Sequence, residues 1–264
     1  MGNPVEVAGR LLAARHAQTA LTDGLPESLR PSGFAEGYAM QRAYVEAHGG
    51  RPIGYKVAAT SDRAQAALGT ETPFYGRLFD STSRLDGVAA NWPAVSFLVG
   101  LVEPEFAVRL AADLPEQASP YDRETVAAAV GSLHPAFEII DSAYGREDWM
   151  SAGAANLIAD NAAHGAFLLG PGTRDFSAEE LTEQQVSLTV DDALIGSGTG
   201  ANALGHPFNV LAWLANELIV QGRFLRAGDL ITTGVVTPFV YLESGQTARA
   251  DFGAFGQISM TFSA

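Results

Sequence analysis

The spacing of apolar residues changes near residue 50 and divides the chain into a helical beginning and a strand-rich remainder. Before that point the apolar residues recur near helical spacing, which predicts helices over Val5–Leu21 and Gly37–Glu46. Beyond it the period falls toward two, which is typical of half-buried strands. We therefore expect one structural unit with a helical N-terminal region, residues 1–50, and a mixed-sheet domain, residues 51–264.

The strand-rich part contains short apolar runs that are rich in β-branched and aromatic residues and bounded by turn residues. The first run begins at Pro52, and Asp191-Asp192 marks the tip of a hairpin. Ser61 can cap a short helix over 61–68. Because strands dominate after a helical start, the pattern indicates an α+β fold rather than regular βαβ units. Further helices are expected at 123–130 and 207–221, and further strands at 97–110, 135–141, 165–169, 185–190, 193–197, 230–236 and 255–262.

Composition narrows the class of protein. The chain has 264 residues, 47% of them hydrophobic, which is enough for a substantial core in one large domain. Cysteine is absent, which excludes disulfides, thiolate metal sites and thiol nucleophiles. No apolar run approaches the roughly 20 residues of a membrane helix, and the first residues lack a signal-peptide pattern, so we expect a cytoplasmic protein. A formal charge of −14 opposes binding to nucleic acid or anionic membranes, and we expect neither as a partner.

Three carboxylates lie inside apolar, β-prone runs. Glu103 and Glu105 are two residues apart in one run, so they project from the same face of a strand, and Glu138 lies in a second run of the same kind. Three converging carboxylates would repel one another, and a divalent cation resolves this conflict. Oxygen ligands favour a hard ion such as Mg²⁺, Mn²⁺ or Ca²⁺. The alternative is that these glutamates are surface positions paired with arginines.

Lys56 is the candidate catalytic group. It shares its strand face with Gly54 and Ala58, whose small side chains leave room above the amine for a ligand. A cation and one lysine could together capture a small anionic substrate despite the negative charge of the chain.

Several motifs of the sequence occur together in one known family. The chain resembles the 2-keto-4-pentenoate hydratase and 4-oxalocrotonate decarboxylase family, within the fumarylacetoacetate hydrolase superfamily. The matching segments run from about residue 50 to the end of the chain: Gly54-Tyr55-Lys56-Val57, Glu103-Pro104-Glu105-Phe106, Phe137-Glu138-Ile139-Ile140-Asp141, Ala159-Asp160-Asn161, Leu204-Gly205-His206-Pro207, Ala227-Gly228-Asp229 and Thr233-Gly234.

The resemblance implies a fold, a cofactor and a substrate class. It implies a mixed β-roll with a helical N-terminal region, and a Mg²⁺ or Mn²⁺ ion held by Glu103, Glu105 and Glu138. It places Lys56 near a bound 2-oxo or 2-hydroxy acid. We also expect a homo-oligomer.

Two residues depart from the family pattern. Phe74 stands where many hydratases of the family have an Asp implicated in proton transfer, an Asp that the decarboxylases also tend to lack. Ala163 stands where the family usually has Ser. Asp141, Asp160 and His164 are candidates for the substrate pocket or for groups behind the ligands, although capping or turn roles suit the two aspartates equally.

We expect a hydratase that adds water to a 2-hydroxy-2,4-dienoate or 2-oxo-4-enoate to give a 4-hydroxy-2-oxo acid. Decarboxylation of a 4-oxalocrotonate-like diacid is the first alternative, because both reactions pass through the same dienolate. C–C hydrolysis of an acylpyruvate, with a His–Glu pair such as His16 and Glu36, is the second. A catalytically silent member that binds 2-oxo acids is the third.

Overall fold

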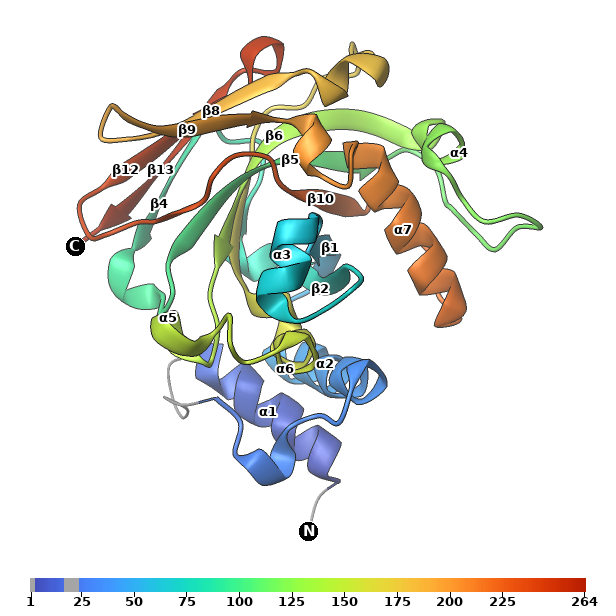
Figure 1. Ribbon diagram of the computed structural model, residues 1–264, viewed down its shortest axis with the longest axis vertical. Helices are drawn as coiled ribbons and strands as arrows, with labels where there is room; N and C mark the ends of the chain where they lie inside the picture. The colour runs from blue at the N-terminus through green and yellow to red at the C-terminus, as the bar shows by residue number, and fades with distance from the viewer. Residues whose placement is uncertain (1–2, 17–23) are drawn as a thin grey trace.

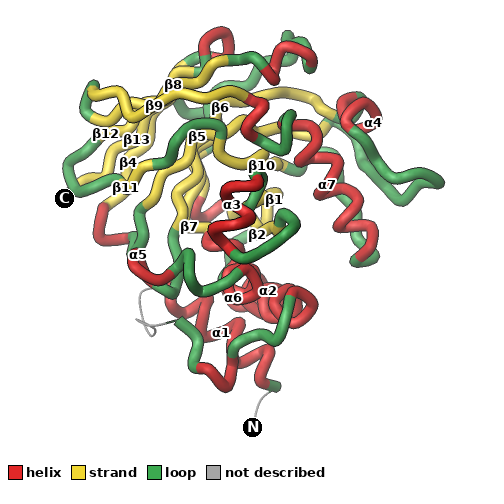
Figure 2. Tube along the Cα trace, viewed as in Figure 1, coloured by secondary structure: helices red, strands yellow, loops and turns green. Residues whose placement is uncertain are grey.

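The computed structural model describes residues 3–16 and 24–264 and contains two curled sheets of mixed direction (Figures 1 and 2). The larger sheet has eight strands in the order β2 (Phe74–Phe79), β1 (Pro52–Ala58), β10 (Leu230–Val235), β5 (Leu101–Leu110), β6 (Val130–Ile140), β7 (His164–Leu169) and β3 (Ser83–Arg84), with β11 (Val240–Tyr241) paired to β5. The smaller sheet has five strands in the order β4 (Ala89–Pro93), β13 (Gln257–Ser263), β12 (Thr247–Asp251), β8 (Gln185–Val190) and β9 (Ala193–Thr199). The expected α+β class and mixed sheet are confirmed.

The helices gather mainly at one end of the molecule and along one edge. At the end opposite the smaller sheet, α1 (Pro4–His16) and α2 (Phe34–His48) pack together, and α2 also packs on α6 (Ala154–Ala159) (Figure 1). The others are α3 (Asp62–Leu68), α4 (Arg123–Ala127), α5 (Gly145–Asp148) and α7 (Pro207–Val220). None of the helices in the described part of the chain is long and apolar enough to cross a membrane.

Most of the predicted elements are present, but several boundaries were wrong, among them the following three. The strand expected from residue 97 begins at Leu101, because Gly100 has a φ of +61° and interrupts the extended backbone. The helix expected over 123–130 ends at Ala127, and Val130 already belongs to β6, which begins before the expected residue 135. Residues 17–21 of the first expected helix lie outside the described residues.

Two local predictions are confirmed by geometry. Ser61 caps α3, since its side chain accepts a hydrogen bond from the Ala64 backbone N–H. Asp191 and Asp192 form the tip of the β8–β9 hairpin with φ values of +48° and +67°, the left-handed conformation that a tight two-residue turn requires.

The strand register places a group of polar residues and a group of apolar residues on the same face of the larger sheet. Glu103 lies directly opposite Glu138, and the registers of β1 with β10 and of β10 with β5 put Lys56 on the same face as these glutamates. The same face continues into a separate apolar cluster that fills one end of the roll: Leu78, Ala107, Ala136, Phe167, Leu169 and Leu230. The larger core lies mostly on the opposite face of this sheet, where it includes residues of α7 and of the smaller sheet.

Candidate active site

The three glutamates singled out in the sequence come together. One ligand oxygen from each of Glu103, Glu105 and Glu138 lies within 4.8 Å of the others. The β5–β6 register creates this cluster, because it sets Glu103 against Glu138 and leaves Glu105 one step further along the same face. Glu105 and Glu138 have no exposed surface, so they are not surface positions paired with arginines.

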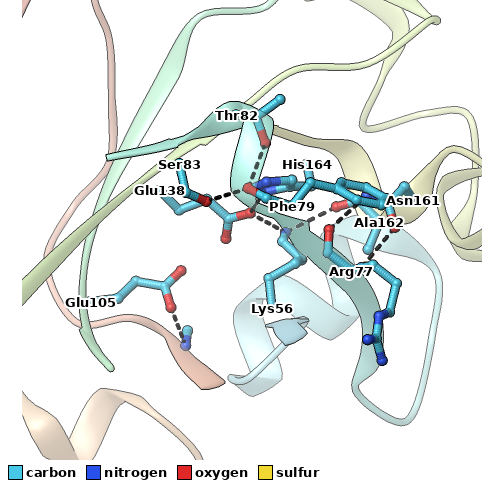
Figure 3. Close-up of polar contacts among 11 residues, drawn as sticks. Lys56, Arg77, Phe79, Thr82, Ser83, Glu105, Glu138, Asn161, Ala162 and His164 are labelled. Atoms are coloured by element: carbon cyan, nitrogen blue, oxygen red, sulfur yellow. Dashed lines mark hydrogen bonds and ion pairs between the residues drawn. The ribbon is translucent and has the colours of Figure 1, made fainter. Parts of the chain in front are cut away.

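Lys56 is the only lysine of the chain, and its amine belongs to this cluster. The side chain is 1% exposed, and Nζ lies 3.2 Å from Glu138 Oε1 (Figure 3). Nζ also donates a hydrogen bond of 2.9 Å to the Ala162 carbonyl oxygen. The small neighbours expected around Lys56 are present, but its amine is already held by two protein oxygens.

His164 is the pocket candidate that reaches the cluster. Its Nδ1 lies 2.9 Å from Glu138 Oε1, the same oxygen that contacts Lys56 (Figure 3). The two aspartates instead hold backbone. Asp141 accepts hydrogen bonds from the Leu98 and Val99 N–H groups, and Asp160 accepts from Ser142 Oγ and the Ala143 N–H. These contacts match the turn role that was open for both aspartates.

A left-handed turn that the sequence did not reveal positions the lysine. Asn161, Ala162 and Ala163 have consecutive φ values of +51°, +57° and +56°, which non-glycine residues rarely adopt even singly. The Asn161 side chain secures the turn, accepting from the Arg77 N–H at 2.7 Å and donating to the Arg77 carbonyl at 2.9 Å. Gly76 allows the close approach, because a Cβ there would overlap the Asn161 carbonyl.

Gly234 positions the Glu105 carboxylate through a backbone hydrogen bond. The Gly234 N–H donates a hydrogen bond of 2.7 Å to Glu105 Oε2. Its φ is +89°, and a Cβ at this position would overlap the Thr60 side chain, so only glycine fits without rearrangement. The Thr-Gly motif at 233–234 thus orients a carboxylate of the cluster.

Each of the two buried carboxylates uses one oxygen for protein contacts and leaves the other without a partner. Glu138 Oε1 contacts Lys56 and His164, whereas Glu138 Oε2 is buried with no hydrogen-bond partner among the described residues. Glu105 Oε2 accepts from Gly234, and Glu105 Oε1 likewise has no partner within the described part of the chain. Buried oxygens of this kind are costly unless a cation binds them, so the donor set fits a hard divalent ion.

The pKa shifts of the three glutamates also favour a bound cation. Burial raises the pKa of Glu103 to about 7, with Lys56 opposing the shift and Glu138 adding to it. Burial, followed by repulsion from Glu138 and Glu103, also raises the pKa of Glu105 well above its ordinary value. Burial works in the same direction on Glu138, but Lys56 and His164 outweigh it and lower the pKa of that carboxyl. Without a cation, the protein therefore holds Glu138 ionised and disfavours the charge on the other two.

The two departures from the family pattern lie close in the fold to Lys56. Phe74 is the first residue of β2, opposite Ala58, on the same sheet face as Lys56, and only 1% of its surface is exposed. Ala163 is buried in the left-handed turn, where its carbonyl accepts from the Asp141 N–H. Of the pair considered for hydrolysis, Glu36 accepts hydrogen bonds from the Ser32 N–H and hydroxyl, and the His16 side chain lies outside the described residues.

Comparison with known proteins identifies a matching family and similar enzymes. Residues 101–263 match the family described as fumarylacetoacetate (FAA) hydrolase, C-terminal. The 2-hydroxyhexa-2,4-dienoate hydratase of Comamonas testosteroni is 33% identical over 98% of this chain and 97% of its own length. The 4-oxalocrotonate decarboxylase of Pseudomonas putida is 30% identical over 87% of this chain and 85% of its own length.

A solved structure extends the likeness to three dimensions. The 4-oxalocrotonate decarboxylase from Pseudomonas putida G7, complexed with magnesium and adipate, superposes with a TM-score of 0.86 at 28% identity. The superposition covers 98% of this chain and 97% of that one. Sequence and structure therefore agree over almost the whole length.

Proposed function

Because the chain belongs to the fumarylacetoacetate hydrolase family, we propose that it is a metal-dependent hydratase that adds water to a 2-hydroxy-2,4-dienoate or 2-oxo-4-enoate. The product is a 4-hydroxy-2-oxo acid. The observation that carries this proposal concerns the carboxylate oxygens of Glu105 and Glu138. In each residue one oxygen contacts a protein group, and the other is buried without a partner among the described residues. The hydratases among its relatives support the choice of reaction.

The cofactor we propose is Mg²⁺ or Mn²⁺, held by Glu103, Glu105 and Glu138. All three donors are carboxylate oxygens, which favour such hard ions over Zn²⁺ or Cu²⁺. When bound, the cation supplies Lewis acidity that polarises the carbonyl of a 2-oxo acid. The related decarboxylase has been crystallised with magnesium in one structure and calcium in another.

Lys56 is the residue to which we assign proton transfer, and His164 positions the carboxylate beside it. Lys56 Nζ lies between Glu138 Oε1 and the Ala162 carbonyl, so its proton donors are directed before substrate arrives. We assign Lys56 to proton delivery and to contact with the substrate carboxylate. His164 holds Glu138 Oε1 from a second side, which fixes the carboxylate and turns its other oxygen toward the cluster.

Decarboxylation of a 4-oxalocrotonate-like diacid remains the second candidate. The TM-score of 0.86 with a decarboxylase favours it, as does Phe74 in place of the hydratase Asp. Phe74 also argues against a diacid, because an apolar ring beside the distal end of a substrate would leave a second carboxylate poorly solvated. We therefore expect 2-hydroxypenta-2,4-dienoate or an alkyl-substituted analogue as the better substrate.

One substrate panel tests the assignment. The purified protein, freed of metal and reloaded with Mg²⁺ or Mn²⁺, is incubated with 2-hydroxydienoates, 4-oxalocrotonate and acylpyruvates, while ultraviolet absorbance and CO₂ release are followed. We expect metal-dependent loss of dienoate absorbance without CO₂. A kcat/KM for 4-oxalocrotonate above that for every monocarboxylate would instead identify a decarboxylase. Turnover by Glu138→Gln equal to that of the unmodified protein would contradict the site assignment, with Arg249→Gln as the control for an exposed charge.

A further inference from the structure

A cavity of about 300 Å³ lies on the face of the larger sheet opposite to Lys56. Tyr55 and Arg77 are register partners on β1 and β2, and they point away from the face that carries Lys56, because side chains alternate along each strand. The segment after α7 closes the cavity with Arg223, Arg226 and Asp229. None of the three glutamates of the cluster lines it, so it is a separate feature of the fold.

Two of the arginines are held in place by tyrosine. Arg223 donates through one Nη atom to the Tyr55 hydroxyl at 2.9 Å and through the other to the Tyr75 hydroxyl at 3.4 Å. The Arg77 guanidinium carbon stacks 3.9 Å from the centroid of the Tyr55 ring. Both guanidinium groups are therefore ordered by neutral partners before any ligand binds, which lowers the entropy cost of binding.

The positive charge of the cavity is not balanced. Asp229 is the one carboxylate that lines it among the described residues, and Asp229 Oδ2 accepts a hydrogen bond from the Arg226 backbone N–H. Within the described ranges, no ion pair joins Arg77, Arg223 or Arg226 to a carboxylate, although the chain as a whole carries a formal charge of −14. Arg77 Nε is moreover buried, with no hydrogen-bond partner among those residues.

We propose that this cavity is a binding site for a small oxyanion, a phosphate or carboxylate group. Three guanidinium groups present planar forks of N–H donors, which match the paired oxygens of both anions. The unused N–H of Arg77 and the remaining donors of Arg223 and Arg226 supply the contacts. The site stands independently of the reaction assigned to the glutamate cluster.

Isothermal titration calorimetry of the metal-free protein with inorganic phosphate, and separately with succinate, tests the proposal. We expect saturable binding of at least one anion, and the tighter of the two identifies the source of the oxyanion. Arg226→Gln should weaken it roughly tenfold, the loss of about one charge-assisted hydrogen bond. Asp229→Asn should tighten it, since it removes the one opposing charge while keeping an acceptor for the Arg226 N–H.

The variants are chosen so that the result is decisive. Arg226 is exposed and makes no side-chain hydrogen bond within the described part of the chain, so its replacement should leave folding intact, which thermal unfolding checks. Arg249→Gln, at an exposed arginine paired with Asp192 on the smaller sheet, is the matched control and should bind like the unmodified protein. Absence of binding by both anions, or equal binding by the Arg226 and Arg249 variants, would overturn the proposal.

Discussion

Substitutions of Lys56 and of Glu138, which form a buried pair, should differ in how far added Mg²⁺ restores the lost stability. With all carboxylates counted as ionised, Lys56 and the three glutamates sum to a charge of −2. Lys56→Met makes this −3, and Glu138→Gln makes it −1. Both side chains are almost fully buried and 3.2 Å apart, so either substitution breaks a buried ion pair. Breaking such a pair costs about 3–5 kcal/mol. We expect the lower end for Lys56→Met, because His164 still contacts Glu138.

Urea unfolding of both single variants and the double variant, with and without Mg²⁺, measures this. In metal-free buffer the double variant should lose less than the sum of the two single losses, by about 2–3 kcal/mol. Magnesium at about 100 times its Kd should restore about 2.7 kcal/mol to Lys56→Met. It should restore little to Glu138→Gln, which has lost a ligand. Additive losses, or equal rescue of both single variants by Mg²⁺, would refute the reasoning. Arg249→Met, in an exposed ion pair, should change stability by less than about 1 kcal/mol.

The remaining predictions address the ligands, the amine, the pH response and one glycine. Glu105→Gln should weaken Mg²⁺ binding steeply in calorimetry, and an unchanged affinity would remove Glu105 from the ligand set. Lys56→Met should lower kcat by about 10²–10⁴-fold while Mg²⁺ still binds, and a near-normal kcat would rule out its role in proton transfer. Burial raises the pKa of Glu103 from 4.5 to about 7, so the folded metal-free protein binds more protons than the unfolded chain in that range. Its Tm should therefore fall as the pH rises from about 4.5 to 7, and saturating Mg²⁺ should flatten the curve; a Tm that rises over this window without metal would contradict the sign. Gly234→Ala should destabilise the protein more than Gly245→Ala in urea unfolding, because the φ values are +89° and +88° but only the first Cβ meets a neighbour. Equal losses would show that backbone conformation alone matters.

Local patterns predicted the components of the site better than their contacts. Strand alternation is enough to put Glu103 and Glu105 on one face. That Glu138 lies opposite Glu103 depends on the register between β5 and β6, which spacing along the chain does not determine. The family resemblance implied only that the three glutamates hold one ion. The contact of Lys56 with Ala162 depends on a left-handed turn at residues 161–163. Its Asn-Ala-Ala sequence contains no glycine, the residue that usually indicates a left-handed backbone.

Several features were missed, each for its own physical reason. β2 is buried on both faces, so Phe74–Phe79 shows no alternation of apolar and polar residues. β3 and β11 have two residues each, too few for any period. The arginine cavity was missed because it joins β2 to the segment after α7, and only the folded chain brings these together.

Because the single lysine of the chain is buried, the rate at which it reacts can report how often the folded protein opens. Lys56 is 1% exposed, so the folded chain presents no lysine amine to an acylating reagent in solution. Acylation of that one side chain then requires a local or global opening, and its rate measures how often the roll exposes its interior. Mass spectrometry of the peptide that contains Lys56 would read this frequency in an unlabelled, unmodified protein. Ligands that close the site would be recognised by the protection they confer, whatever reaction they undergo.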